Sequence, residues 1–300
     1  MEQIKFTADR SGERIDRFLS ENLENLSRSY IQKLLKDGKI SVNQSSVKPN
    51  YKISENDKIE VFIPDPEVLD ILPENIPLDI LYEDSDILIV NKPKNMVVHP
   101  APGHYEHTLV NAVMYHCKDN LSGINGILRP GIVHRIDMDT TGSLLICKND
   151  KAHQIIAEQL KEHSITRRYH AIVHGKIKED NGVVNAPIGR HPIDRKKMST
   201  KAKNGKHAVT HYTVLRRFKD YTYIECELET GRTHQIRVHI GHPILGDSMY
   251  GPSKCPFKLQ GQTLHAKVLG ITHPSTGKYI EVDAPLPEYF NKLLKQLEER

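Results

Sequence analysis

The sequence GIVHRIDMDTTG, residues 131–142, decides how the rest of the chain is interpreted. It places six ionisable or hydroxyl side chains between two glycines, and the apolar run LLIC, residues 144–147, follows it. After polar residues 148–150 a helical pattern begins. The predicted order is therefore polar loop, buried strand, turn and helix. A carboxylate loop attached to a core strand is held rigidly, as a catalytic group requires. A surface turn rich in Asp and Thr is the alternative.

Composition sets only broad limits on the class of protein. The chain has 300 residues, enough for one or two domains with a sizeable core. Lys plus Arg number 42 and Asp plus Glu number 38, a net charge of +4 that does not by itself indicate a nucleic-acid partner. The first residues do not resemble a signal peptide, and no apolar stretch approaches the ~20 residues that span a bilayer. We therefore expect a cytoplasmic protein, and we expect it to be a monomer.

The cysteines and histidines do not predict a disulfide or a metal site. Cys117, Cys147, Cys226 and Cys255 lie far apart and form no CxxC pair. Cys147 and Cys226 fall in apolar strand patterns, so buried reduced thiols are expected. The 17 histidines form no Cys/His cluster with zinc-finger spacing, so we expect no metal.

Residues 1–63 predict a small domain of their own. Two amphipathic helical patterns within residues 15–35 are followed by Gly38, which is placed to end the second helix. Two strand-like runs follow within residues 39–63. This order of elements resembles the RNA-binding module named after ribosomal small-subunit protein S4. Its basic side chains are expected to meet RNA phosphates; a solvated helix face is the alternative. These side chains are Arg14, Arg28, Lys33, Lys36, Lys39 and Lys52.

The rest of the chain divides into a linker and a larger domain. Residues 64–77 contain four prolines, break every periodic pattern and predict a linker. Residues 78–300 then form the second domain. Within it, residues 190–219 contain ten Lys or Arg and a single acidic residue, Asp194. Because this basic run spans a loop and a strand without acidic neighbours, it is the best candidate in the chain for binding an RNA backbone, especially at Arg195, Lys196 and Lys197.

Two known families place Asp residues in a loop like that of residues 131–142. Asp137, Asp139 and Thr141 fit the Asp-x-Asp-x-Thr motif of haloacid-dehalogenase-type phosphatases. However, His134 and Arg135 interrupt the apolar strand that this motif should cap, and no magnesium-binding acidic pair is evident downstream. The sequence HRIDMDTTG is much more similar to the HRLDxxTSG motif of the RluA/RluD family of pseudouridine synthases.

Four further motifs extend this second resemblance over nearly the whole chain. NKP at residues 91–93 is followed by the His-Pro of residues 99–100, RRYHAIVHG occupies residues 167–175, and LHA occupies residues 264–266. TGRTHQIR, residues 230–237, matches the family motif residue for residue. The segment that follows is shorter than expected for the family by about three residues, which is nearly one helical turn.

The resemblance implies an α+β fold, with a mixed, mainly antiparallel central sheet preceded by a small α/β RNA-binding module. It implies an isomerase that breaks the N-glycosidic bond of a uridine, turns the uracil and rejoins it through carbon. This reaction involves no redox change and no energy input, so no cofactor is expected. RluD-type members act on large-subunit ribosomal RNA, while others act on other rRNA sites or on tRNA. A non-catalytic RNA-binding or ribosome-assembly protein and a magnesium-dependent phosphatase are the alternatives.

The resemblance also implies which residues carry the reaction. Asp137 is the catalytic carboxylate, as nucleophile or as base. A buried carboxylate would otherwise gain a proton, so it needs a cationic partner. That partner is Arg237 in a bidentate pair, with Arg232 as the second choice.

Three further residues are expected to handle the target base. Tyr169 stacks on the uracil, or else is a core tyrosine whose hydroxyl finds a nearby partner. Leu264 is expected to contact the substrate. The target base must be extruded from folded RNA, and Arg135, two residues before Asp137, could fill the vacated stack. An ordinary pairing role inside the protein is the alternative for Arg135.

Overall fold

The structure is a computed structural model, and the chain divides into two compact units, residues 1–69 and 70–300. Half of the predicted linker, residues 64–70, lies outside the described residues, so the boundaries at 63 and 78 stay predictions. The structure describes residues 2–23, 26, 28–63, 71–101, 103–118, 120–124 and 130–299.

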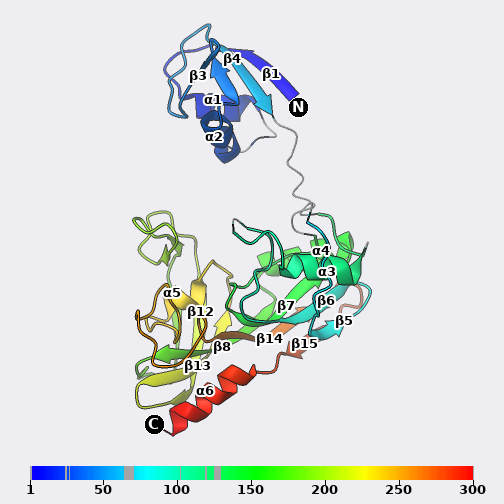
Figure 1. The fold of residues 1–300 in the computed structure, drawn as a ribbon, viewed down its shortest axis with the longest axis vertical. Coiled ribbons are helices and arrows are strands. Elements are labelled where there is room, and N and C mark those ends of the chain that lie inside the picture. The colour runs from blue at the N-terminus through cyan, green and yellow to red at the C-terminus, as the bar shows by residue number, and fades with distance from the viewer. Residues whose placement is uncertain are drawn as a thin grey trace. The chain divides into compact units, whose positions relative to one another are not determined.

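The first unit is a four-stranded antiparallel sheet with two helices packed on it (Figure 1). Apolar side chains of both helices, such as Phe18 and Leu34, share one buried cluster with Ile59 and Val61 of the sheet. The predicted pair of helices followed by strands is confirmed. In chain order the elements are β1 (Glu2–Thr7), α1 (Ile15–Asn22), α2 (Arg28–Lys36), β2 (Ile40–Val42), β3 (Ser45–Ser46) and β4 (Lys58–Ile63).

Gly38 ends α2 as the sequence predicts. Its φ of +68° lies in the left-handed region that glycine adopts without a steric penalty. The N–H of Lys39 then donates to the carbonyl of Leu34 at 2.8 Å, and the N–H of Gly38 reaches that of Leu35 at 3.4 Å. These two bonds satisfy carbonyls that the end of a helix otherwise leaves without partners.

The second unit is built on a sheet with the strand order β5-β6-β7-β14-β8-β13-β12-β9, and β15 pairs with β14. Neighbouring strands are antiparallel except β7 and β14, which are parallel. The predicted mixed, mainly antiparallel sheet is therefore confirmed. Its strands are β5 (Ile80–Glu83), β6 (Ile87–Lys92), β7 (Thr141–Cys147), β8 (Thr166–His174), β9 (Asn181–Asn185), β12 (Val209–Arg217), β13 (Tyr221–Leu228), β14 (Leu264–Thr272) and β15 (Tyr279–Asp283), while β10 (Gly189–Arg190) and β11 (Met198–Ser199) form a separate ribbon.

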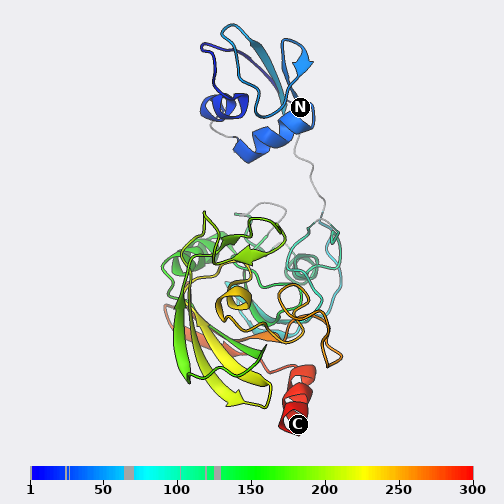
Figure 2. The same ribbon diagram turned by 90° about the vertical axis from the view of Figure 1, so that its left-hand side faces the viewer.

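Helices cover this sheet on both faces. Along β6, Leu88 and Val90 join the buried cluster that contains α3 and α5, whereas Ile87 and Ile89 join the cluster that contains α4. A strand covered on both sides reads as a continuous apolar run, which explains residues 87–90. In Figure 2 the long green and yellow strands run side by side, with α6 in red at the C-terminal end. The helices are α3 (Leu109–Cys117), α4 (Asp150–Lys161), α5 (Gln235–His239) and α6 (Glu288–Glu298).

The parallel pair of β7 and β14 depends on a glycine. Gly142 lies opposite Ala266 and has a φ of +107°. A Cβ atom at Gly142 would lie 2.3 Å from the carbonyl oxygen of Ala266, so only glycine allows this approach. The pairing places the loop before β7 beside Leu264 at the start of β14.

Two predictions about the chain's chemistry can be compared with the structure directly. The four cysteines are free thiols, and Cys147 and Cys226 are buried as expected; Cys117 is buried as well. None of the described helices combines the length and apolar character of a membrane span.

Candidate active site

The polar loop of residues 133–140 is attached to the core strand that follows it. The backbone N–H of Leu145, in the middle of β7, donates to Nε2 of His134 at 3.0 Å. Burial lowers the pKa of His134 to about 3, so the imidazole is neutral and its Nε2 is free to accept. This bond fixes one side of the loop three residues before Asp137.

The other side of the loop is held by Lys92, at the end of β6. Its ammonium donates to the backbone carbonyls of Pro93, Met96 and Met138 at 2.7, 2.8 and 2.9 Å. Burial lowers the pKa of Lys92 to about 7. Three carbonyl acceptors nevertheless match the three hydrogens of a charged ammonium, so we assign the charged form. Lys92 thereby fixes the residue directly after Asp137.

Arg237, on the short helix α5, is shared between two carboxylates. Its Nη1 lies 2.8 Å from Oδ2 of Asp137, while Nε and Nη2 lie 2.6 and 2.8 Å from the two carboxylate oxygens of Asp247. The side chains of Asp247 and Arg237 are 0% and 7% exposed, and that of Asp137 is 23% exposed. Burial alone would lower the pKa of Arg237, but hydrogen bonds and charge from Asp247 and Asp137 raise it. The predicted contact with Asp137 is present, but its predicted bidentate geometry is wrong, because the bidentate partner is Asp247.

His234 approaches the second oxygen of Asp137. Its Nε2 lies 3.9 Å from Oδ1 of Asp137, and its Nδ1 lies 2.8 Å from the hydroxyl of Tyr250. Burial lowers the pKa of His234, which favours the neutral imidazole. The residue has a φ of +56°, a strained conformation for a side chain with a Cβ. Oδ1 of Asp137 is thus left at the pocket without a direct cationic partner among the described residues.

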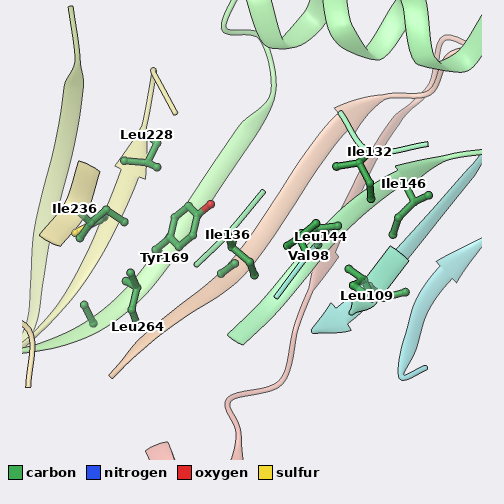
Figure 3. Packing of buried hydrophobic residues seen from close by; sticks show 14 of the residues in the cluster. Val98, Leu109, Ile132, Ile136, Leu144, Ile146, Tyr169, Leu228, Ile236 and Leu264 are labelled. Atoms are coloured by element: carbon green, nitrogen blue, oxygen red, sulfur yellow. The ribbon is translucent and has the colours of Figure 1, made fainter. Parts of the chain in front are cut away.

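The pocket beside Asp137 has a volume of about 310 Å³, within the usual range of ligand sites. Tyr169 forms part of its wall and lies among Ile136, Leu228, Ile236 and Leu264 (Figure 3). At 8% exposure Tyr169 belongs both to the core and to the pocket, so the two interpretations of its role are compatible. Of the predicted site residues, the pocket brings together Arg135, Asp137, Tyr169, Arg232, Arg237 and Leu264.

Two of these arginines do not contact Asp137. Nη1 of the exposed Arg135 lies 3.2 Å from Nε2 of His99, which fits the internal pairing alternative while leaving the side chain at the pocket. Nε of Arg232 donates to the carbonyl of His207 at 2.9 Å. The second choice of Arg232 as the carboxylate partner is therefore not supported.

The predicted phosphate-binding residues differ in how free they are. Arg195 and Lys196 are exposed in the turn between β10 and β11, and Nζ of Lys197 lies 5.9 Å from the ring centre of Tyr250, next to Arg237. The expected lack of acidic neighbours is wrong for Arg216 and Arg217, which pair with Glu298 and Asp180. Lys197 also lies 3.9 Å from Asp194, so Arg195 and Lys196 are the exposed side chains of this turn that have no acidic partner among the described residues.

In the first unit, two of the six predicted RNA-binding side chains, Arg28 and Lys36, also differ in how free they are. Arg28 donates to the buried carboxylate of Asp16, at 3.1 Å from Nη2. Lys36 is exposed in the last turn of α2. Arg28 therefore has a structural partner, and Lys36 is the freer of the two.

One cluster in the described parts of the chain has metal-ligating side chains: Asp84, Asp86 and His273. Both nitrogens of His273 are already used, because Nδ1 accepts backbone N–H groups and Nε2 lies 2.7 Å from Asp84. Asp84 also accepts the N–H groups of Asp86 and Ile87. These bonds indicate that the cluster stabilises the turn between β5 and β6.

Sequence reasoning missed three residues of the site: Lys92, Asp247 and Arg167. Lys92 belongs to the NKP motif, and a lysine that directly continues an apolar run suggests a buried cation. Arg167 shares the alternation of Tyr169 along β8, which places both on one face. No local sequence pattern marks Asp247, because its contact with Arg237 depends on how the turn between the two residues folds.

The structure thus fixes a carboxylate beside a pocket of about 310 Å³ on a mainly antiparallel sheet, and comparison with known proteins identifies the family. A family model described as RNA pseudouridylate synthase matches residues 86–242, and the S4 domain model matches residues 13–59. The chain therefore belongs to the RluA family of RNA pseudouridine synthases and carries an N-terminal S4 domain, through which it binds RNA.

Relatives and solved structures give the same result. The chain is 55% identical to the uncharacterized RNA pseudouridine synthase YlyB of Bacillus subtilis, over 99% of both chains. It is 46% identical to the ribosomal large subunit pseudouridine synthase D of Zymomonas mobilis, over 99% of this chain and 97% of that one. The structure of human RNA pseudouridylate synthase domain containing 1 has a TM-score of 0.56 and 23% identity, covering 79% of this chain and 98% of that one, which supports the fold.

Proposed function

We propose that this enzyme converts specific uridines of large-subunit ribosomal RNA to pseudouridine, with Asp137 as the catalytic carboxylate. The observation that carries the assignment of Asp137 is its geometry. One oxygen is held 2.8 Å from Arg237, the other lies 3.9 Å from His234, and the residue lines the pocket. The choice of ribosomal RNA is supported by relatives at 40–46% identity whose names specify the large ribosomal subunit.

The arrangement supports the following division of roles. Asp137 acts on the ribose as nucleophile or as base, and Arg237 offsets its negative charge. Tyr169 and Leu264 hold the uracil while it is detached and turned. Arg135, exposed at the pocket, fills the stack that the extruded base leaves.

RNA binding is assigned to both units. The S4 domain contributes Lys36 and other exposed basic side chains, and the second unit contributes Arg195, Lys196 and Lys197 of the β10–β11 ribbon. Such contacts to phosphates position the RNA without reading its sequence.

The test is to map pseudouridines in total RNA from cells that lack this protein. We expect specific sites in large-subunit ribosomal RNA to be lost and to return with the wild-type gene, but not with Asp137→Asn. Loss at tRNA sites instead would overturn the substrate assignment. Sites that return with Asp137→Asn would favour the non-catalytic role, and activity abolished by EDTA would favour the phosphatase.

Paired substitutions of Tyr169 test the stacking role. Tyr169→Phe keeps the ring and Tyr169→Leu loses it. Base–aromatic stacking contributes roughly 1–3 kcal/mol, so turnover per folded molecule should fall about ten- to a hundredfold in the Leu variant. If Phe is as damaged as Leu, the hydroxyl takes part in the reaction. Normal turnover in both variants, with lower melting temperatures, would leave Tyr169 as a core residue only.

A further inference from the structure

Arg167 is a buried cation in the pocket wall, and none of the described residues forms an ion pair with it. It lies two residues before Tyr169 on β8, on the same face of the sheet. Only 6% of the residue is exposed, and it lines the same pocket as Asp137. The charges of Arg167 and Asp137 both act on the Tyr169 hydroxyl. Burial raises the pKa of Tyr169, Arg167 lowers it and Asp137 raises it.

The hydrogen bonds of Arg167 use only part of its guanidinium. Nη2 donates to the backbone carbonyl of Glu229 at 2.8 Å and reaches that of Leu228 at 3.5 Å. Nε is buried and has no hydrogen-bond partner among the described residues. No described carboxylate forms an ion pair with Arg167 either. A buried charge without a counter-charge is costly in a folded protein, so its presence in a pocket wall suggests a charge supplied from outside.

The space around the guanidinium is also specific. A Cβ atom at Gly231 would lie 2.7 Å from Nη1 of Arg167, so the glycine leaves room for the side chain. The adjacent Arg168 differs, because it is more exposed and has a carboxylate partner. Its side chain is 32% exposed and lies 3.1 Å from Glu281 on β15. The chain therefore offers a matched control, one residue away on the other face of the same strand.

The reaction creates one negative charge in this pocket. Breaking the bond between N1 and C1′ leaves both electrons on the uracil, which becomes an anion spread over N1 and its carbonyl oxygens. As a nucleophile, Asp137 loses its charge by bonding to C1′; as a base, it loses it by taking a ribose proton. Either route transfers one negative charge from Asp137 to the uracil. When C5 bonds to C1′, the bond between Asp137 and C1′ breaks or, on the base route, Asp137 returns the ribose proton, so the negative charge goes back to Asp137. The C5 proton then leaves and N1 gains a proton, which gives the neutral product.

We propose that Arg167 is a catalytic residue that stabilises the detached uracil anion through its unused N–H groups. A fixed cation that meets charge formed during the reaction lowers the barrier more than it strengthens substrate binding. An RNA phosphate is a poorer fit, because phosphates meet exposed side chains such as Arg195, whereas Arg167 is buried beside Tyr169 and Leu228. This inference rests on the proposed role of Asp137.

The test compares Arg167→Met, Arg167→Lys and the control Arg168→Met in single-turnover assays. The substrate is a transcript containing the uridine found by the mapping experiment. We expect Arg167→Met to react ~10²–10³-fold more slowly, the range measured when one donor to a developing charge is removed. Arg167→Lys should recover part of the rate, and Arg168→Met should behave as wild type. RNA affinity and its salt dependence should not change in Arg167→Met.

A second substrate distinguishes charge stabilisation from a structural role. In 5-fluorouridine RNA the departing base is a less basic anion and needs less help. The defect of Arg167→Met in forming the rearranged nucleoside should therefore be clearly smaller with this RNA. An equal defect on both substrates would overturn the proposal.

Other outcomes would overturn it in identifiable ways. Weaker binding with a salt slope lower by about one, together with a normal rate on bound RNA, would indicate a phosphate contact. A lower melting temperature with normal turnover per folded molecule would indicate a structural role. Wild type and Asp137→Asn are run in parallel. If wild type is inactive or Asp137→Asn is active, the proposed function fails, whereas an active Arg167→Met with those controls intact overturns only the role of Arg167.

Discussion

The two units each contain a buried carboxylate held by arginine, but they complete the cluster differently. In the S4 domain, Asp16 is 0% exposed and accepts hydrogen bonds from Arg14, Arg28 and Gln32. Burial would raise the pKa of Asp16, but these three partners outweigh it and lower the pKa to about 2. Both oxygens are occupied, so the cluster is closed.

In the catalytic unit the corresponding cluster is left open at one end. Asp247 takes up two nitrogens of Arg237 and is fully buried, while Asp137 takes one nitrogen and remains 23% exposed. The same pair of chemical groups thus serves stability when every acceptor is used. In the proposed function, it serves reactivity where the carboxylate of Asp137 lines the pocket and has only one of its oxygens bound to the arginine.

The largest effect should follow from changing the open carboxylate. Asp137→Asn keeps the shape of the side chain but removes the charge, so turnover should fall by ~10⁴-fold or more, as expected for a group on which the whole reaction depends. Pseudouridine formation in a single-turnover assay measures this, with the melting temperature and RNA affinity as controls for folding. Measurable turnover near the wild-type rate would show that Asp137 is not the catalytic group.

A smaller loss of activity is expected from changing Asp247, the fully buried carboxylate of the same cluster. Asp247→Asn would present an amide N–H₂ to the nitrogens of Arg237, so Arg237 should lose its orientation toward Asp137. We expect activity to fall ~10–100-fold, as is typical of residues that orient a group at the reacting site. Asp283→Asn, at an exposed carboxylate, is the control. Unchanged turnover in Asp247→Asn would mean that α5 alone positions Arg237.

Removing the S4 domain tests whether the two units are independent. Deletion of residues 1–63 should leave a folded catalytic unit, because each unit has its own buried core. We expect a weaker affinity for RNA and a smaller salt slope, since fewer phosphates are contacted, with a normal rate on saturating RNA. Loss of the melting transition of the second unit would place the boundary elsewhere.

The smallest effect on activity is expected at the closed cluster of the S4 domain. Because the folded pKa of Asp16 lies below its unfolded value of 3.8, its contribution to stability is present above pH 4 and is lost as the pH falls toward 2. Asp16→Asn should destabilise this domain by roughly 2 kcal/mol at pH 7, and the difference from wild type should vanish only below about pH 2, the folded pKa of Asp16. Hydrogen exchange in α1 of the full chain measures this. A difference that does not depend on pH would show that packing, and not charge, is responsible.

The sequence predicts the elements well where the pattern is local. The helices of the S4 domain, the end of α2 at Gly38 and the strand of residues 167–175 follow from periodicity or from a single special residue. The sites at Asp137, Tyr169 and Arg237 followed from motifs, and their meeting at one pocket depends on β8 and β14 pairing across the sheet.

What the sequence did not predict involves contacts between distant segments. The bidentate partner of Arg237 is Asp247, ten residues later, and the turn between them has no periodic pattern. The acidic partners of Arg216 and Arg217 come from α6 and from the segment before β9, so the local charge balance was misleading. Arg167 could have been placed on the face of Tyr169, but its lack of a counter-charge is visible only in three dimensions.

The position of β14 in the sheet has a consequence for how the enzyme folds. This strand lies between β7 and β8, and the bond between Thr141 and His265 joins residues 124 positions apart. Contacts of such high sequence separation are slow to form, because a long loop must close before they stabilise anything. During synthesis the loop of Asp137 therefore leaves the ribosome well before the strand that completes its support. The catalytic unit should become active late, in one cooperative step, while the S4 domain, whose buried core lies within residues 8–61, can fold early.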